Sequence, residues 1–345
     1  MPYVRNAWYV GAWSREIGAA PVRRTMLGEN LVLFRTSDGA PVALHDRCPH
    51  RFLPLSKGTV KGDLIQCGYH GLTFDGAGRC VHSPTQAAVP PHADVRAFPA
   101  VERFGLVWIW MGDPARADAA DLCPLPQFGD AAWRATEGDP LYVKAGYLLL
   151  CDNLCDPTHV TYVHPTTLGS PEVPDVPVTH QAQPWGVSTT RWTRDCAPVG
   201  LFQAFGNYAG TVDRWQHYHM HVPSAAIIDT GTIVAGSGDD RSGGQGRVQI
   251  IACHFMTPVS ESETIDYWLH LRNFATDDAG VDDRLNAQLR IAFAEDKDIL
   301  EAIEVEEQAH RDAPKAGLDL DASAGLFRRM VNQRIREERT AAAAE

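Results

Sequence analysis

The sequence lacks any apolar run close to the roughly 18 residues that a membrane-spanning helix needs, so we expect no membrane partner. Positive charge is also scarce, because 31 Lys and Arg oppose 43 Asp and Glu and the formal net charge is −12. Such an acidic chain does not favour nucleic acid as a partner, although a local basic pocket can still bind an acidic ligand. No basic segment followed by a long apolar run opens the sequence, so we expect no signal peptide and a bacterial cytoplasmic location.

Two signatures of redox proteins are missing as well. The sequence contains neither the G-x-G-x-x-G fingerprint of a dinucleotide-binding fold nor the C-x-x-x-x-C-x-x-C run of a plant-type ferredoxin. Eight cysteines in 345 residues are too few for a disulfide scaffold. We therefore expect reduced thiols, most of them small buried side chains and two of them metal ligands.

The pattern of short strands predicts two domains. Alternating apolar runs such as NLVLFRT and LVWIWMG fill the first third of the chain and are typical of small antiparallel sheets. A passage rich in Ala, Asp and Pro, residues 114–126, is the predicted linker. We expect one domain over residues 1–115 and a second over residues 116–345.

The second part mixes strands and helices. One helical segment begins near residue 147 and breaks near Pro157, and a late segment, residues 282–310, has apolar residues at helical spacing. A glycine-rich stretch over residues 236–246 is the predicted loop between two strands. The strand-like runs are GVSTTRW, DRWQHYHMH, AAIIDTGTIV, RVQIIACHFM and TIDYWLHLRNF.

Two short segments each place a cysteine beside a histidine. HDRCPHRFLPL contains Cys48 and His50, and QCGYHGLTFD contains Cys67 and His70. Zinc motifs usually keep their cysteines together and their histidines together, whereas here each half supplies one of each. A Rieske [2Fe-2S] cluster needs this mixed order, because two thiolates hold one iron and two histidines hold the other. The segments predict such a cluster, with a zinc site as the alternative.

A second group of ligand-type residues follows in DNLCDPTHVTYVH. His159 and His164 lie five positions apart, and Asp156 precedes them. Two histidines and one carboxylate leave open positions on Fe(II) for dioxygen. The carboxylate has to come from elsewhere in space, and Asp296, beside Glu295 in the late helix, is the candidate. A solvated acidic helix face is the alternative for that cluster.

Together, C-x-H, C-x-x-H and D-N-x-x-D-x-x-H-x-x-x-x-H resemble the oxygenase component of Rieske non-haem iron oxygenases. The resemblance is strongest to the group of vanillate O-demethylase, dicamba monooxygenase and toluenesulfonate methyl-monooxygenase. Phrases such as VRNAWYV, VERFGLVWIWMGDP and YVHPTTLG extend it over nearly the whole chain. It implies an α+β fold, with an N-terminal all-β Rieske domain and a C-terminal helix-grip catalytic domain of antiparallel sheet and helices.

The resemblance also implies roles for single residues. It assigns the [2Fe-2S] cluster to the two cysteine-histidine pairs, and the mononuclear iron to His159, His164 and Asp296. Asp156 matches a carboxylate that links a cluster histidine of one subunit to an iron histidine of its neighbour, and Asn153 matches an asparagine close to the iron. Because the family's subunits form rings, usually trimers, a homotrimer is implied.

The implied reaction is an O2-dependent monooxygenation of an aromatic acid, either O-demethylation with release of formaldehyde or methyl hydroxylation. Electrons from NAD(P)H would arrive through a separate reductase or ferredoxin, since the chain has no nucleotide fingerprint of its own. Two alternatives stay open. One is a ring hydroxylase acting on a non-acid aromatic, and the other is a non-catalytic electron carrier with about two irons instead of about three.

Four residues are candidates for contact with the substrate. His254 matches a histidine in the pocket of the dicamba enzyme, with an ordinary strand histidine as the alternative. Arg191 and Arg214 could hold a carboxylate, although strand arginines are usually salt-bridged. His219 lies in the alternating run DRWQHYHMH, where hydrogen-bonded histidines are the alternative.

Overall fold

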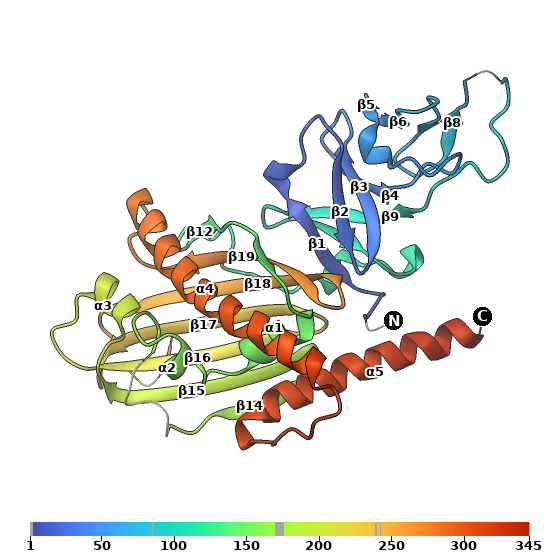
Figure 1. Cartoon of the computed structure of the whole chain (residues 1–345). Helices are drawn as coiled ribbons and strands as arrows, with labels where there is room; N and C mark the ends of the chain where they lie inside the picture. The colour runs from blue at the N-terminus through green and yellow to red at the C-terminus, as the bar shows by residue number, and fades with distance from the viewer. Residues whose placement is uncertain (1–2, 85, 170–175, 239, 242, 345) are drawn as a thin grey trace. The chain divides into compact units, whose positions relative to one another are not determined.

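The computed structural model (Figure 1) describes most of the chain, in five stretches: residues 3–84, 86–169, 176–238, 240–241 and 243–344. Short strands dominate the N-terminal part, and long strands with helices follow. Within these stretches no helix combines the length and the apolar character that crossing a bilayer requires.

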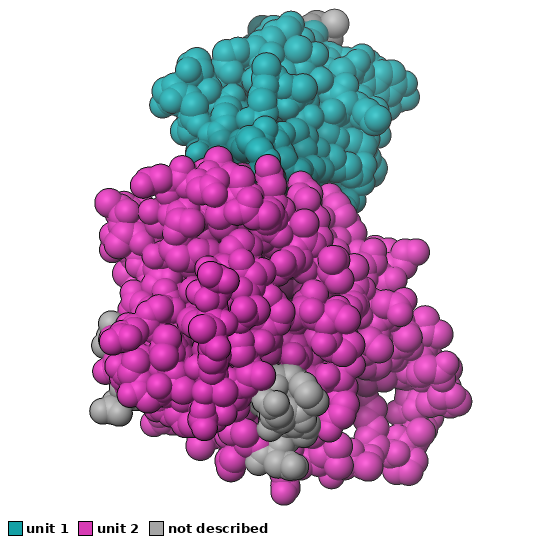
Figure 2. Space-filling model, turned by 90° about the vertical axis from the view of Figure 1, so that its left-hand side faces the viewer, with its two compact units in different colours: residues 1–122, 257–261, 337–345 teal, residues 123–256, 262–336 magenta. Residues whose placement is uncertain are grey.

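The chain divides into two compact units (Figure 2). Unit 1 contains residues 1–122, 257–261 and 337–345, and unit 2 contains residues 123–256 and 262–336. That the N-terminal domain ends at residue 115 stays a prediction. The predicted linker contains two short 3-10 helices, η3 (Pro114–Arg116) and η4 (Ala119–Asp121), each capped by an aspartate.

Unit 1 is built from eleven short strands in three antiparallel sheets (Figure 1). The first sheet has the order β1-β11-β10, the second β2-β3-β4-β9, and the third β5-β6-β7-β8. These strands are β1 (Trp8–Trp13), β2 (Val22–Met26), β3 (Glu29–Arg35), β4 (Pro41–His45), β5 (Thr59–Lys61), β6 (Leu64–Gln66), β7 (Thr73–Phe74), β8 (Cys80–His82), β9 (Ala97–Phe98), β10 (Ala100–Arg103) and β11 (Leu106–Trp110). Two further 3-10 turns of the unit are η1 (Ser14–Glu16) and η2 (Leu55–Lys57).

Buried apolar side chains of these strands form the core of unit 1. Val32 and Phe34 of β3 are fully buried and pack with Leu44 and Phe74. The predicted small antiparallel sheets are confirmed, because the alternating runs NLVLFRT and LVWIWMG contain β3 and β11.

Unit 2 is organised around one eight-stranded sheet. Its order is β12-β19-β18-β17-β16-β15-β14, with β13 also paired to β19. The strands are β12 (Arg134–Glu137), β13 (Leu141–Val143), β14 (Thr179–Gln183), β15 (Gly186–Cys196), β16 (Val212–His221), β17 (Ala225–Val234), β18 (Val248–Ser260) and β19 (Glu263–Arg272). All five predicted long strands are present. The glycine-rich stretch falls between β17 and β18 as predicted, although its residues 239 and 242 lie outside the described residues.

Helices cover one face of this sheet (Figure 1). They are α1 (Tyr147–Cys155), α2 (Val160–Val163), α3 (Gly200–Gly206) and α4 (Ala279–Ala309), followed along the chain by η5 (Asp319–Asp321) and α5 (Ala322–Ala344). The long helix α4 starts at Asp278, whose carboxylate accepts a hydrogen bond from the Gly280 amide. Its apolar residues pack on the sheet through Leu285 and Leu289. The predicted α+β architecture is thus confirmed.

Candidate metal centres and substrate pocket

The two cysteine-histidine segments form loops of the same backbone design. In each, the cysteine amide donates to the carbonyl five residues later, and the amide four residues later donates back to the cysteine carbonyl, at distances between 2.8 and 3.1 Å (Cys48 with Leu53 and Phe52; Cys67 with Leu72 and Gly71). The residue four positions after the cysteine has positive φ in both loops, 59° and 79°. Glycine adopts this conformation without strain at the second position.

This shared design brings like side chains together. The rings of His50 and His70 lie 4.5 Å apart between centroids and are exposed. The thiols of Cys48 and Cys67 are buried, and burial together with the neighbouring thiol raises the pKa of Cys48 to about 11. Two thiols therefore lie inside and two imidazoles lie at the surface of unit 1.

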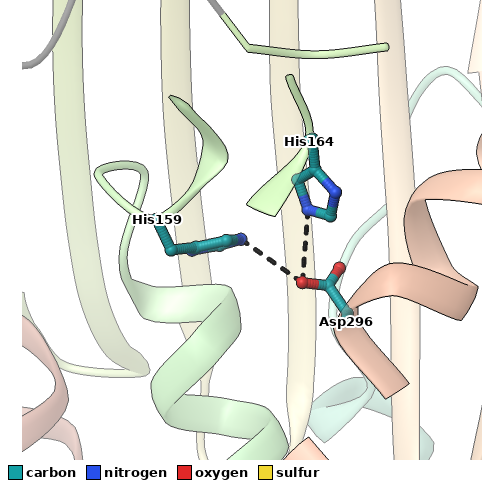
Figure 3. A group of neighbouring side chains, drawn as sticks. All are labelled: His159, His164 and Asp296. Atoms are coloured by element: carbon teal, nitrogen blue, oxygen red, sulfur yellow. Dashed lines mark ion pairs between the residues drawn. The ribbon is translucent and has the colours of Figure 1, made fainter. Parts of the chain in front are cut away.

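Three ligand-type side chains meet in unit 2 (Figure 3). In the described part of the chain, the ligand atoms of His159, His164 and Asp296 lie within 4.8 Å of one another. The histidines flank the single-turn helix α2, and Asp296 comes from α4. Oδ1 of Asp296 lies 3.2 Å from Nε2 of His164 and 3.5 Å from Nε2 of His159.

Neighbouring polar groups orient this triad. Nδ1 of His164 lies 2.8 Å from Oε2 of Glu295, and the amide of Asn153 donates to Oδ1 of Asp296 at 3.0 Å. Burial on its own would lower the pKa of His164, but Asp296 and Glu295 outweigh it and raise that pKa. Sequence analysis did not assign a role to Glu295. Its position next to Asp296 in the predicted helix could have indicated one.

Asp156 is held close to His159 but does not bind its ring. Its carboxylate accepts hydrogen bonds from the amide and the hydroxyl of Thr158, at 2.7 and 2.8 Å. Its Oδ2 lies 3.9 Å from Nδ1 of His159, and that buried nitrogen has no hydrogen-bond partner among the described residues. Burial lowers the pKa of His159.

A cavity lies in unit 2, lined by the three ligand-type residues and by the facing strands of the sheet. Most of its wall is apolar and includes Leu289 and Phe293 of α4. Its polar side chains are few, as in most pockets for small organic ligands. The strand residues among them are Arg214, Gln216, Tyr218, Thr230 and His254.

The four substrate candidates fall into different places. His254 and Arg214 line the cavity. Arg191 is buried and donates to Oε1 of Gln216 at 3.0 and 2.6 Å. His219 lies on the opposite face of β16, because side chains alternate along a strand, and its Nδ1 lies 2.9 Å from the hydroxyl of Ser188.

Two cavity residues were not singled out from the sequence. Gln216 and Tyr218 share a face of β16 with Arg214, since the three are spaced by two residues. The same alternation that groups the histidines of DRWQHYHMH on one face groups these residues on the other. Gln216 and Tyr218 line the cavity only because the helices cover their face of β16. The sequence of the strand does not show which face is covered.

Comparisons with known proteins agree with both centres. Residues 7–99 match the Rieske [2Fe-2S] domain, and residues 143–337 match the vanillate O-demethylase oxygenase C-terminal domain. The chain belongs to the vanillate O-demethylase group of Rieske oxygenase components. Its relatives include the toluene-4-sulfonate monooxygenase system iron-sulfur subunit of Comamonas testosteroni, 36% identical over 97% of this chain and 98% of that protein.

Both a curated relative and a solved structure similar to this Rieske oxygenase are named for dicamba. The oxygenase component of dicamba O-demethylase from Stenotrophomonas maltophilia is 37% identical over 88% of this chain and 89% of that protein. A crystal structure of dicamba monooxygenase bound to 3,6-dichlorosalicylic acid superposes with a TM-score of 0.90, at 34% identity, over 97% of this chain and 98% of that chain. The predicted family resemblance is confirmed.

The side chains present fit the two iron centres of a Rieske oxygenase. Two buried thiols and two exposed imidazoles on paired loops are the donor types that a Rieske cluster uses. Two imidazole nitrogens and a carboxylate oxygen are the donor types that mononuclear Fe(II) with open positions uses. The contact of Nδ1 of His164 with Glu295 leaves Nε2 directed to Asp296, as a metal-binding histidine requires.

Proposed function

We propose that this chain is the oxygenase component of a multicomponent Rieske system, which monooxygenates an aromatic acid by O-demethylation or methyl hydroxylation. The observation that carries this proposal is the His159, His164 and Asp296 triad on the wall of a mostly apolar cavity. An electron carrier would not need such a cavity, and a structural zinc site would use all its ligand positions.

The proposed ligands of the mononuclear iron are His159, His164 and Asp296, and those of the cluster are the two cysteine-histidine pairs. Iron bound to two histidines and one carboxylate supplies dioxygen activation. Glu295 keeps the proton on Nδ1 of His164, so that Nε2 stays an acceptor. Asn153 fixes Asp296 through its amide, and the apolar wall limits the access of water.

The partners follow from the same proposal. A separate reductase or ferredoxin supplies the electrons. We further propose a homotrimer, in which Asp156 of one subunit joins the iron histidine His159 to a cluster histidine of its neighbour. The carboxylate 3.9 Å from a buried Nδ1 without a hydrogen bond supports this role. A cytoplasmic location is supported by the eight cysteines, none of which is joined in a disulfide.

Single-turnover chemistry tests the activity without the partner reductase. Holoprotein reduced by dithionite, then freed of reductant, would be mixed with 18O2 and either 4-methylbenzenesulfonate, a methoxybenzoate or an uncharged methoxybenzene. The proposal predicts a hydroxylated or demethylated acid, with formaldehyde from the methoxy compound and 18O in the hydroxymethyl product. Oxidation of the cluster with no oxygenated product from any acid would contradict it.

A further inference from the structure

Arg214 is a buried cation whose charge is unmatched in the described part of the chain. The residue is 3% exposed, its Nε makes no hydrogen bond, and no carboxylate forms an ion pair with it. The guanidinium carbon of Arg214 lies 5.8 Å from the centre of the Phe202 ring. Burial lowers the pKa of Arg214 to about 10, so the side chain is still charged at neutral pH.

Two other buried arginines of unit 2 are held by hydrogen bonds inside the fold, although Nη1 of Arg191 has no partner among the described residues. Arg272 is fully buried and donates to Asp282 and to three backbone carbonyls. Arg191 donates to Gln216 and to the carbonyl of Pro157, at 2.7 Å. A desolvated charge without a partner is costly, so a fold that keeps one has a use for it. Arg214 differs from these two arginines in lining the cavity.

The groups next to Arg214 leave a second hydrogen-bond donor for the cavity. Gln216 uses Oε1 to accept from Arg191, and its Nε2 donates to the hydroxyl oxygen of Tyr218 at 3.2 Å. The hydroxyl proton of Tyr218 is therefore left to donate elsewhere. Arg214 and Tyr218 lie on one face of β16, four residues apart, and both line the cavity.

The sheet register separates this end of the cavity from His254. Arg214 pairs with Thr232 of β17, whereas His254 of β18 pairs with Ala226. These positions of β17 are six residues apart, which is about 20 Å along the strand. Nδ1 of His254 is in addition taken up by the carboxylate of Asp266, at 2.7 Å.

We propose that Arg214, assisted by the hydroxyl of Tyr218, binds the anionic group of the substrate, a carboxylate or a sulfonate on an aromatic ring. The assignment rests on the proposed oxygenase function and adds where the acid is held, at the end of the cavity remote from His254. A guanidinium presents paired N–H donors that match two oxygens of either anion.

Calorimetric titration of the oxidised, anaerobic holoprotein measures this binding without turnover. The probes are 4-methylbenzoate, 4-methylbenzenesulfonate and, as the uncharged match, 4-methylbenzamide. The Arg214→Met substitution should weaken binding of the favoured anion about 100-fold and leave the amide within about threefold. Tyr218→Phe should weaken it about tenfold, because one hydrogen bond to a charged group is lost. The ratio of the affinities for the two anions shows whether the site prefers a carboxylate or a sulfonate.

Two control variants accompany these measurements. Arg290→Gln removes an exposed arginine of α4 that pairs with Asp139. This substitution should change neither the affinity for the anions nor the affinity for the amide. His254→Gln tests the competing cavity residue, and it should leave the preference for anion over amide intact. Loss of that preference in His254→Gln, but not in Arg214→Met, would overturn the assignment.

Thermal unfolding separates binding from a structural role. Because Arg214→Met removes an unmatched buried charge and keeps an apolar side chain, it should raise the Tm while abolishing anion preference. A lowered Tm with unchanged anion affinity, or a wild-type protein that binds the anions no better than the amide, would refute the proposal. If the anion site behaves as expected and no acid is oxygenated, only the proposed activity fails.

Discussion

The two pairs of histidines in this chain occupy opposite environments. His50 and His70 stand exposed at the tips of two similar loops in unit 1, each next to a buried cysteine. His164 in unit 2 is 1% exposed and contacts two carboxylates. An electron-transfer centre benefits from ligands near the surface, whereas a centre that reacts with dioxygen and an organic substrate benefits from a desolvated pocket.

The two sites also differ in how the backbone places their side chains. The loop ligands depend on local backbone hydrogen bonds and on a positive φ, so each loop specifies its own geometry. The triad depends on α2 and α4, which are far apart in sequence and meet only through packing on the sheet. We therefore expect the two centres to be lost independently.

The largest expected effect comes from removing one histidine of either pair. His159→Ala should abolish mononuclear iron and turnover while the reduced cluster keeps its electron paramagnetic resonance signal. His50→Ala should do the reverse, with loss of the cluster signal and retention of iron in the triad. Iron and sulfide analysis of both variants checks the pair of results. Loss of both centres from either variant would show that they are not independent.

The next effect concerns the link between the centres. Asp156→Asn should retain cluster and mononuclear iron but lower turnover by about 100-fold or more, because a neutral amide cannot hold a histidine proton as a carboxylate does. Steady-state turnover with reductase, together with iron analysis, measures this. The exposed Asp283→Asn on α4 is the control. Full activity of Asp156→Asn would exclude the bridging role.

A smaller effect is expected from the residue that orients His164. Glu295→Gln should weaken mononuclear iron binding by about 10- to 100-fold, since the carboxylate contact to Nδ1 is lost. Competition with a chelator at fixed Fe(II) gives the affinity, and Asp298→Asn, exposed three residues further along α4, is the matched control. An unchanged affinity would mean that Glu295 does not position the ligand.

The smallest expected effect is on the pH dependence of stability, and it comes from His270, a buried histidine outside both centres. His270 is fully buried, and burial lowers its pKa to about 4 even though its Nε2 donates a hydrogen bond to Oδ1 of Asn286. Since the unfolded histidine titrates at about 6.5, the unfolded chain binds the extra proton between these values. Stability from His270 is thus present above pH 6.5 and lost as the pH falls towards 4, by up to about 3 kcal/mol.

Denaturant unfolding of wild type and His270→Gln at pH 7.5 and pH 5 measures this contribution. Glutamine keeps a hydrogen-bonding group for Asn286 and does not titrate, so the wild type should lose more stability than the variant on acidification. Equal losses in the two proteins would show that His270 is not the cause.

Much of this molecule was predictable from its sequence. The spacing C-x-H and C-x-x-H predicted a Rieske cluster, and the alternating runs predicted the strands of both units. The helix over residues 282–310 was predicted from its apolar spacing and is α4. These features depend on local periodicity and on turn chemistry, which a sequence displays directly.

The roles of side chains in the cavity were harder to predict. Arg191 and Arg214 look alike in sequence, yet one is held by Gln216 and the other has no hydrogen bond at Nε. His219 faces away from the cavity because the helices cover the other face of β16. Such differences arise from packing between distant elements, which single-sequence patterns do not contain.

Mössbauer spectroscopy of 57Fe-enriched protein tests the central claim most directly, since it resolves the cluster irons from mononuclear iron in one sample. With two separate centres in each chain, dithionite-reduced protein should show cluster and mononuclear high-spin Fe(II) signals with areas in a ratio of about 2:1. A spectrum containing only cluster iron, or only mononuclear iron, would contradict the account.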